Sequence, residues 1–219
     1  MKKISEFKNL IFDCDGIILN SNKIKSQAFI DVVSCYGEEA SSELVKYHRS
    51  NGGISRYEKF GYFCDKIAKD LNLNLTNLSV SYLLEKYSFE VKKKLEECEI
   101  AQDILDFRKS SNAEWYIVSG SDQKELIEVF KKRKLIKSFD GGIYGSPSSK
   151  DEIFKNMIKQ KKIIPSDSLY IGDSRYDYLS ARNNNIDFVF LTKWSEFHEI
   201  NSFAIDNNVE IYKEFLEII

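Results

Sequence analysis

The sequence lacks the features that would direct it to a nucleic acid or a membrane. Lys and Arg total 32 against 34 Asp and Glu, so the formal net charge of -2 supplies no field that attracts a polyanion or an anionic lipid surface. The apolar runs are far shorter than the roughly 20 residues that span a bilayer, and the charged N-terminal stretch does not have the pattern of a signal peptide. We therefore expect a cytoplasmic protein with neither nucleic acid nor membrane as a partner.

The sequence is also poor in soft metal ligands. Its four cysteines are widely spaced and form no C-x-x-C pair, which argues against a zinc–thiolate site or a redox dithiol and predicts free thiols. Its two histidines, His48 and His198, lack the H-E-x-x-H spacing, and each is expected to be a surface or structural residue. A histidine-rich metal centre is thereby excluded.

What the chain does have is enough apolar sequence for a core. It contains 219 residues, 42% of them hydrophobic and 30% charged, which predicts one or two domains. Short apolar runs, typical of buried parallel strands, alternate with segments whose apolar residues recur at spacings of three and four. The runs cover 8–13, 113–120, 168–173 and 187–192, and the helical segments cover 123–133, 150–160 and 176–184. This alternation predicts an α/β fold with a Rossmann-like parallel sheet, whose ligands bind at the carboxyl ends of the strands.

One segment departs from the alternation. Between residues 21 and 100, helical patterns follow one another with no convincing strand, and the Gly-rich stretch 51–53 is expected to be a loop. We interpret 21–100 as an inserted all-helical domain and 1–20 with 101–219 as the catalytic core. A last helix over 208–219 is expected to pack on the edge of the sheet.

A pair of carboxylates closes the first apolar run. The run LIF (10–12) is followed by Asp13 and, two positions on, by Asp15. A carboxylate at a strand end can attack phosphorus and become an aspartyl phosphate, while a second acid can protonate the leaving oxygen and later deprotonate water. Asp13 and Asp15 are therefore candidate catalytic residues, although acidic pairs are also common at loops and caps.

Two further positions carry groups suited to an anion. Ser119 and Gly120 follow the run WYIV and are expected to open the next helix, so that a hydroxyl and backbone N–H groups face one edge of the sheet; the alternative is a plain helix N-cap. Lys150 begins a predicted helix, where a cation opposes the helix dipole. All three are candidates for phosphate binding, although an isolated lysine is more often a surface residue.

The fourth position suits a divalent cation. The segment GDSRYD (172–177) follows the run SLYI and places Asp173 and Asp177 at a strand end and in the following turn. Magnesium prefers such oxygen ligands, and it would offset the repulsion among these acids, Asp13, Asp15 and a substrate phosphate. Helix capping explains one of the two acids but not both. We therefore expect Mg²⁺ as the cofactor.

These four segments, with a helical insertion after the first, resemble the motifs of the haloacid dehalogenase superfamily of phosphatases. KNLIFDCDGIILNS (8–21) is similar to the first motif, VSGS (118–121) to the second, Lys150 after FDGGIYGSPSS to the third, and GDSRYD to the fourth. The resemblance covers nearly the whole chain. Asn20 stands where many relatives have Asp, a departure that removes no catalytic group.

The resemblance implies a role for each matched residue of the reaction. Asp13 would be the nucleophile and Asp15 the general acid and base. Ser119, with the adjoining Gly120, and Lys150 would hold the transferring phosphoryl group. The helical insertion would then correspond to the small cap of this superfamily, which closes over the site and excludes water.

The resemblance also implies a set of magnesium ligands. Asp13 would contribute its carboxylate and Asp15 its main-chain carbonyl. Asp173 would ligate the ion directly, and Asp177 would act from outside the ligand sphere or through water.

The resemblance further extends to the branch that includes phosphoglycolate phosphatases and β-phosphoglucomutases. Dehalogenases lack an acid at the position of Asp15, which favours phosphoryl chemistry here. The cap segment GGISRYEKF (52–60) is similar to a mutase cap loop with an arginine, here Arg56. Arg56 either binds an anionic group of the substrate or is an ordinary solvated helix residue. Arg49 and Lys59, near Tyr47 and Tyr57, also suggest an anionic or hydroxylated substrate.

We expect a Mg²⁺-dependent phosphatase that hydrolyses a small phosphorylated metabolite, such as a sugar, polyol, amino-alcohol or glycolate-type phosphate, through an aspartyl phosphate. The alternatives are a sugar phosphomutase and, from another class, a non-catalytic phosphate-binding regulatory module. The presence of every catalytic group disfavours the last. The sequence predicts no particular oligomeric state.

Overall fold

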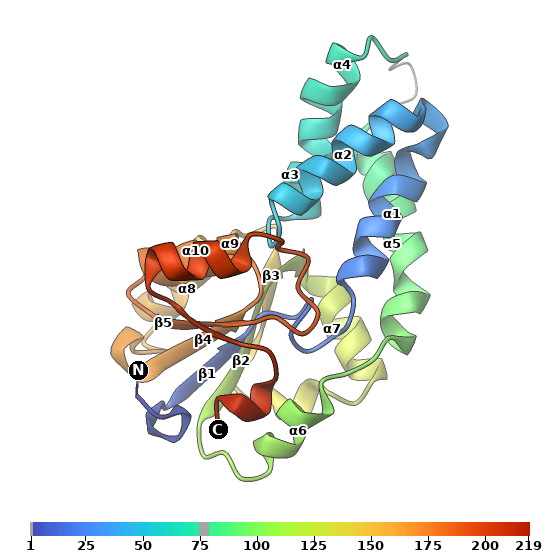
Figure 1. The fold of residues 1–219 in the computed structure, drawn as a ribbon. Helices are drawn as coiled ribbons and strands as arrows, with labels where there is room; N and C mark the ends of the chain where they lie inside the picture. The colour runs from blue at the N-terminus through green and yellow to red at the C-terminus, as the bar shows by residue number, and fades with distance from the viewer. Residues whose placement is uncertain (1, 75–78) are drawn as a thin grey trace.

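A computed structural model describes residues 2–74 and 79–219. One part is a parallel sheet flanked by helices, and the other is a group of helices that stands beyond one edge of the sheet (Figure 1). The chain enters the helical group after the first strand and returns before the second.

The sheet has six parallel strands in the order β3-β2-β1-β4-β5-β6. This order places β1 at the centre, between β2 and β4, and reverses direction there, as in a doubly wound fold. The predicted α/β class with a Rossmann-like parallel sheet is confirmed. The strands are β1 (Asn9–Phe12), β2 (Glu114–Asp122), β3 (Gly142–Ser146), β4 (Ser168–Gly172), β5 (Asp187–Leu191) and β6 (Glu210–Tyr212).

Both faces of the sheet are covered, which explains why its central strands are uniformly apolar. Alternate residues of β1 point to opposite faces: Leu10 and Phe12 belong to the cluster that includes α7 residues, and Ile11 belongs to the cluster that includes α8 and α9 residues. All four residues of β1 are buried. The flanking helices are α6 (Gln102–Arg108), α7 (Gln123–Lys132), α8 (Lys150–Lys159), α9 (Arg175–Asn183) and α10 (Ile200–Asn207).

The inserted segment contains helices joined by loops, and none of its described residues belongs to a strand of the sheet. Its two connections to the core run side by side, because Leu19 and Ile100 form an antiparallel bridge and the Asn20 N–H donates to the Glu99 carbonyl at 3.0 Å. We keep 21–100 as the proposed extent of the cap. Its helices are α1 (Asn22–Val33), α2 (Glu38–Ser50), α3 (Arg56–Tyr62), α4 (Ala68–Asp70) and α5 (Val80–Glu97), with a π-helical turn (Phe63–Ile67) between α3 and α4.

Two strands were not anticipated. β3 lies in the glycine-rich stretch that the sequence presents as a loop; it pairs Ile143 with Ile117 of β2. The predicted last helix over 208–219 is wrong: α10 ends before Asn208, whose left-handed φ of 52° terminates it, and β6 then pairs with β5. Glycine weakens the strand signal, and a three-residue edge strand is too short to show alternation.

Two other expectations concern the thiols and the membrane. All four cysteines are free, as predicted. Across the described ranges, every helix is too short or too polar to span a bilayer.

Candidate active site

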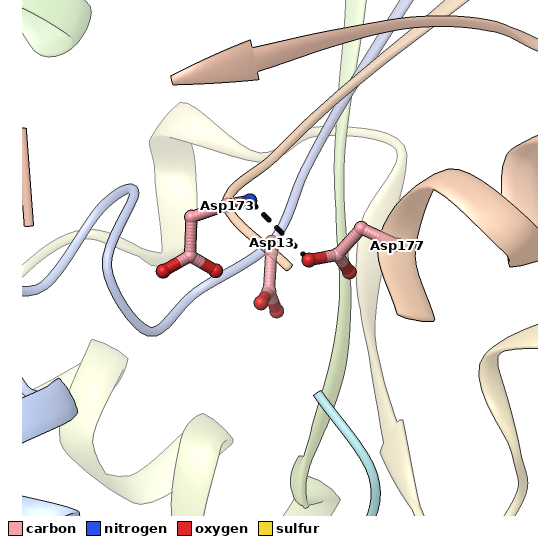
Figure 2. Close-up of side chains that lie close together, drawn as sticks. All are labelled: Asp13, Asp173 and Asp177. Carbon is pink, nitrogen blue, oxygen red and sulfur yellow. Dashed lines mark hydrogen bonds between the residues drawn. The ribbon is translucent and has the colours of Figure 1, made fainter. Parts of the chain in front are cut away.

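Three predicted acids meet where β1 and β4 end. Asp13 follows β1, Asp173 follows β4 and Asp177 lies in the first turn of α9. Figure 2 shows the three carboxylates side by side, and their ligand atoms lie within 4.8 Å of one another. All three residues are buried. Adjacent parallel strands thus bring together acids that are up to 164 positions apart in the sequence.

Asp13 is held by the backbone and by one cation. Its Oδ1 accepts the Cys14 N–H at 2.7 Å and lies 3.2 Å from Lys150 Nζ. Burial raises the pKa of Asp13 to about 7, while Lys150 acts in the opposite direction and the neighbouring acids add to the rise. A carboxylate in this position is stabilised in its charged form by any added cation.

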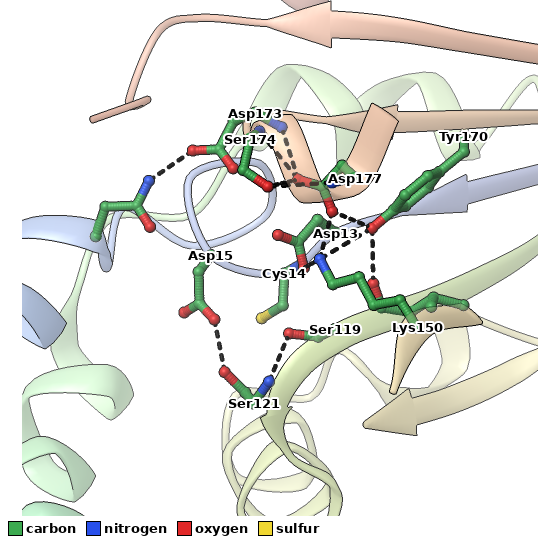
Figure 3. Close-up of polar contacts among 12 residues, drawn as sticks. Asp13, Cys14, Asp15, Ser119, Ser121, Lys150, Tyr170, Asp173, Ser174 and Asp177 are labelled. Carbon is green, nitrogen blue, oxygen red and sulfur yellow. Dashed lines mark hydrogen bonds and ion pairs between the residues drawn. The ribbon is translucent and has the colours of Figure 1, made fainter. Parts of the chain in front are cut away.

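Lys150 and Asp177 form a fully buried ion pair at the same edge (Figure 3). Lys150 begins α8, and its Nζ also donates to the Tyr170 hydroxyl at 3.1 Å. Burial disfavours its charge, but Asp13 and Asp177 outweigh burial and raise the pKa of Lys150. Lys150 therefore presents a permanent positive charge beside the Asp13 carboxylate.

Both carboxylate oxygens of Asp177 accept hydrogen bonds from neighbouring residues. Oδ1 accepts from Lys150 and, at 2.6 Å, from the Tyr170 hydroxyl. Oδ2 accepts from the Ser174 hydroxyl at 2.6 Å and the Ser174 N–H at 3.0 Å. Asp177 is thus placed to fix Lys150 and the β4–α9 turn.

Asp13 and Asp173 are better suited than Asp177 to bind a hard cation. Asp173 Oδ2 accepts from Asn22 at 2.6 Å, whereas Asp173 Oδ1 and Asp13 Oδ2 accept no hydrogen bond within the described ranges. Burial, followed by the charges of Asp177 and Asp13, raises the pKa of Asp173 well above its usual range. Two buried carboxylates with unused oxygens are a donor set that suits Mg²⁺.

Asp15 points away from this cluster, toward the cap. Its Oδ2 accepts the Ser121 hydroxyl at 2.6 Å (Figure 3). The same oxygen lies 2.6 Å from Lys25 Nζ, and Ser21 donates to Oδ1. Burial opposes the charge, but Lys25 and these hydrogen bonds hold the pKa of Asp15 below its usual range. Lys25 comes from α1, so a cap helix supplies the counter-ion of a core acid.

Ser119 and Gly120 lie inside the end of β2. The expectation that they open a helix is wrong, because the strand continues to Asp122, which caps α7 by accepting the Glu125 N–H at 3.0 Å. Ser119 is fully buried and its hydroxyl accepts the Ser121 N–H. A Cβ on Gly120 would fall 2.1 Å from the Gly53 carbonyl oxygen of the cap loop. Glycine is therefore required where the cap approaches the core.

Arg56 is not a solvated helix residue. Its side chain is only 6% exposed, and its guanidinium nitrogens lie 3.0 and 2.9 Å from the two carboxylate oxygens of Glu125 on α7. It also donates to Ser88 and lies over the Tyr87 ring. This buried pair joins the cap to the core.

Arg49 and Lys59 line the same cavity as Arg56. The cavity lies between cap and core, and its empty volume is about 810 Å³ with its open mouth included. Lys59 is buried on α3 and Arg49 is exposed on α2. Asp13, Asp15 and Asp173 form part of the opposite wall.

Several site residues escaped the sequence analysis. Lys25, Asn22 and Glu125 carry no local motif, and only their partners in space reveal them. His48, expected at the surface or in a structural role, lines the cavity and its Nδ1 lies 2.8 Å from Lys59 Nζ. The sequence did offer one indication that His48 belongs to the site: it lies eight residues before Arg56, in a segment noted for its basic residues.

Comparisons with known proteins agree with this geometry. Residues 10–191 match the model of a family described as haloacid dehalogenase-like hydrolase. The chain is 22% identical over 190 residues to a phosphorylated carbohydrates phosphatase of Thermotoga maritima, with 83% of each chain covered.

Solved structures show the same fold. A predicted phosphoglycolate phosphatase from Haemophilus somnus superposes with a TM-score of 0.75 at 17% identity, covering 98% of this chain and 97% of that one. A β-phosphoglucomutase from Clostridium difficile gives a TM-score of 0.73 at 18% identity, covering 97% and 93%.

The family match spans most of the chain and includes the first strand and the fourth motif. Together with the named phosphatase it confirms the prediction of a phosphoric monoester hydrolase. This chain belongs to the haloacid dehalogenase-like hydrolase family.

Proposed function

We propose that this enzyme is a Mg²⁺-dependent phosphatase that hydrolyses a small phosphorylated metabolite through a phosphoryl group on Asp13. The observation that carries the proposal is the convergence of Asp13, Asp173 and Lys150 in one buried cluster, with Asp15 two positions after Asp13. A regulatory phosphate-binding module would have no need for a second acid beside a buried nucleophile.

In the first step, Asp13 attacks phosphorus. An oxygen of its carboxylate bonds to phosphorus as the bond to the ester oxygen breaks, and Asp15, in its protonated form, delivers a proton to the departing alcohol. Lys150, 3.2 Å from Asp13, stabilises the negative charge that gathers on the phosphoryl oxygens. Ser119 and the Gly120 N–H are proposed to orient that group.

In the second step, water releases the phosphate. Asp15, now ionised, takes a proton from water as the water oxygen attacks phosphorus, and the bond to Asp13 breaks. The contact with Lys25 favours the ionised form of Asp15, which is the form that this step requires. Asp13 and Asp15 then return to their starting states.

Mg²⁺ would be held by the carboxylates of Asp13 and Asp173 and the Asp15 main-chain carbonyl, with Asp177 outside the ligand sphere. When bound, it supplies positive charge that offsets the repulsion between the acids and the substrate phosphate. The raised pKa values of Asp13 and Asp173 favour such an ion, because their buried charges have too few counter-ions without it.

The cap wall is proposed to contact the rest of the substrate. Arg49, Arg56 and Lys59 line it together with the aromatic rings of Phe29 and Tyr87, whose centroids are 4.6 Å apart. Polar and aromatic groups in one cavity suit a small hydroxylated or anionic metabolite, such as a sugar, polyol, amino-alcohol or glycolate-type phosphate.

Phosphate release from p-nitrophenyl phosphate and a panel of metabolite phosphates tests the proposal. We expect turnover with Mg²⁺, no turnover in excess chelator, and recovery when Mg²⁺ is restored. Full activity in chelator would contradict the metal-dependent mechanism. Isomerisation of a sugar phosphate with little phosphate release would replace the phosphatase with a mutase.

A further inference from the structure

Asn22 is the first residue of the cap helix α1, and its side chain reaches the core. Its Nδ2 donates to Asp173 Oδ2 at 2.6 Å and to the Trp194 main-chain carbonyl at 2.9 Å. A side-chain amide has two N–H donors, and both are used here. Because the Trp194 carbonyl can only accept, the amide nitrogen of Asn22 faces these partners, and the orientation of the amide is fixed.

Asp173 is held at a second atom by the loop that follows β5. The Ser195 hydroxyl donates to the Asp173 main-chain carbonyl at 2.7 Å and accepts the Phe197 N–H at 3.1 Å. The preceding residue, Trp194, carries the carbonyl that accepts from Asn22. This loop therefore holds Asp173 directly through Ser195 and indirectly through Asn22.

A glycine leaves the space in which Asn22 meets Asp173. Gly16 has a φ of 77°, and a Cβ added to it would lie 2.2 Å from Asp173 Oδ2 and 2.4 Å from Asn22 Nδ2. Any larger residue at this position would force the two side chains apart. The contact between Asn22 and Asp173 thus depends on the backbone of the segment that follows the first strand.

The hydrogen bond makes the two carboxylate oxygens of Asp173 unequal. Oδ2 accepts from Asn22, whereas Oδ1 accepts no hydrogen bond within the described ranges. In Figure 3, the hydrogen-bonded oxygen lies on the side of Asp173 away from Asp13. A partner on one oxygen restricts rotation of a carboxylate, and such partners orient the ligands of metal sites. The free oxygen of Asp173 is therefore kept on the side of the other acids.

The same face of α1 contacts the core at two more points. Lys25, three residues after Asn22, pairs with Asp15, and Ser26, four residues after it, donates to Glu196. Residues three and four apart lie on one face of a helix. Of these three contacts, only that of Asn22 reaches the side chain of a proposed metal ligand.

We propose that Asn22 is a positioning residue for the metal site: from the cap it orients the Asp173 carboxylate so that Oδ1 stays available to Mg²⁺, and it thereby makes Mg²⁺ affinity depend on the contact between α1 and the core. Coupling between two equilibria is reciprocal, so this contact should in turn be favoured when Mg²⁺ is bound. Ser195 supports the same role by fixing the Asp173 backbone. The inference rests on the proposed function in taking Asp173 as a direct ligand.

Metal binding to the substrate-free protein tests the inference without turnover. Mn²⁺, which takes the same oxygen ligands as Mg²⁺, is titrated into each protein, the free ion is followed by its electron paramagnetic resonance signal, and Mg²⁺ is then used to displace it. Asn22→Leu, which has about the same size but no donor, should weaken binding of both ions by about 10- to 100-fold, the cost typical of losing a partner of a metal ligand. Ser195→Ala should weaken binding in the same direction.

Two control variants separate this contact from other features of α1. Gln27→Leu is matched to Asn22→Leu, because it removes an exposed amide from the same helix, whose Nε2 donates to Asp31 at 2.8 Å. Ser26→Ala removes a contact between α1 and the core that does not involve Asp173. Both controls should bind Mn²⁺ and Mg²⁺ as the wild type does.

Kinetics with p-nitrophenyl phosphate distinguish positioning of the metal ligand from a general structural role. Asn22→Leu should need more Mg²⁺ for half-maximal rate, but its kcat should approach the wild-type value at saturating Mg²⁺, because the reacting groups are unchanged. Variants that merely destabilise the cap would keep a low kcat at every Mg²⁺ concentration.

The outcomes that overturn the inference differ from those that overturn the proposed function. Unchanged affinity in Asn22→Leu, or in Ser195→Ala where the Asn22 variant does not fold, would overturn the inference. An equal loss of affinity in Ser26→Ala, or a kcat of Asn22→Leu that stays low at saturating Mg²⁺, would do the same. A wild-type protein that binds neither ion would overturn the proposed metal-dependent function instead.

Discussion

The two ends of the cavity differ in the sign of their uncompensated charge. At the core end, Asp13 and Asp173 are buried carboxylates whose pKa values are raised by burial, with Lys150 as the nearest cation. At the cap end, burial lowers the pKa of Lys59 to about 7, and Lys59 and Arg49 contact no carboxylate of the described chain. Buried charge without a counter-ion is unfavourable, so the core end is suited to a cation and the cap end to an anion.

The two ends also differ in how they are built. The core residues lie at the ends of adjacent strands. The register of these strands sets the positions of the core residues relative to one another. The cap residues lie on α2 and α3, which depend on cap packing and on contacts such as Arg56 with Glu125. The core end therefore has the rigidity that chemistry requires, and the cap end can vary with substrate.

The largest effect is expected from removing the nucleophile at the core end. Asp13→Asn keeps the shape of the side chain but cannot attack phosphorus, so hydrolysis of p-nitrophenyl phosphate should fall by at least about 10⁴-fold. Asp167→Asn, which changes a core carboxylate 2.7 Å from Lys8 and outside the cavity, should retain activity. A loss of less than 10-fold in the Asp13 variant would place the nucleophile elsewhere.

The second prediction distinguishes the roles of Asp177 and Asp173 at the core end of the cavity. Asp177→Asn weakens the hold on Lys150 and should lower kcat by about 10²- to 10³-fold, as expected for lost electrostatic stabilisation. Its Mg²⁺ requirement should change little. Asp173→Ala should instead raise the Mg²⁺ concentration needed for half-maximal rate, because Asp173 is the proposed direct ligand.

Rates measured across a Mg²⁺ titration distinguish the two variants. The control is Asp187→Asn, an exposed acid at the start of β5. If both variants shift the Mg²⁺ requirement equally, Asp177 also binds the ion directly, and the division of labour between these acids is wrong.

The third prediction concerns the point where the two ends meet. In Gly120→Ala, the new Cβ would clash with the Gly53 carbonyl, so the cap must move away from the core. We expect kcat/KM to fall by about 10- to 100-fold, because a displacement near 1 Å costs about 10²-fold. Gly61→Ala, where an added Cβ meets no atom within 4 Å, is the control for a cap glycine. Unchanged kinetics in the Gly120 variant would show that close approach of the cap is not needed for turnover.

The same contrast explains what the sequence could predict. Asp13 and Asp173 were predicted to lie together because apolar runs mark buried strands, and because the carboxyl ends of parallel strands meet at one edge. Lys150 was noted as a cation at the start of a predicted helix. The short β6 and the glycine-rich β3 gave too little pattern to be recognised. The core end was predictable since its acids follow apolar runs that mark the strands.

The cap end was less predictable because its chemistry depends on tertiary pairs. Arg56 was singled out from the sequence, but its partner Glu125 lies 69 positions away on a helix of the core. Lys59 and His48 differ from ordinary helix residues in their burial and in having no carboxylate within contact distance. The spacing of residues in the sequence does not predict either property. The role of Lys59 as a substrate ligand is a proposal.

The smallest predicted effect tests Lys25, the cap cation that pairs with Asp15. Lys25 Nζ lies 2.6 Å from Asp15, and this pair helps to lower the pKa of Asp15. The ionised Asp15 is the proposed base for attack of water, so kcat should fall as pH drops through its pKa. In the wild type that fall should occur below the usual range of Asp. Lys25→Met should raise the pKa of Asp15, because an opposite charge at this distance favours the ionised carboxylate and the variant removes it.

The measurement is the pH profile of kcat for p-nitrophenyl phosphate between about pH 3.5 and 8, with saturating Mg²⁺ and substrate, because its leaving group departs without a proton from Asp15 and only the base role of Asp15 is then tested. The acidic limb should move to higher pH in Lys25→Met, while kcat on the plateau above pH 7, where Asp15 is ionised in both proteins, should change much less than in the Asp177 variant. Lys23→Met removes an exposed lysine from the same helix and should leave the limb in place, which controls for the general loss of positive charge on α1. A limb that stays fixed in Lys25→Met would mean that a group other than Asp15 controls the acidic side of the profile, and that the contact between Lys25 and Asp15 serves to join cap and core without tuning the base.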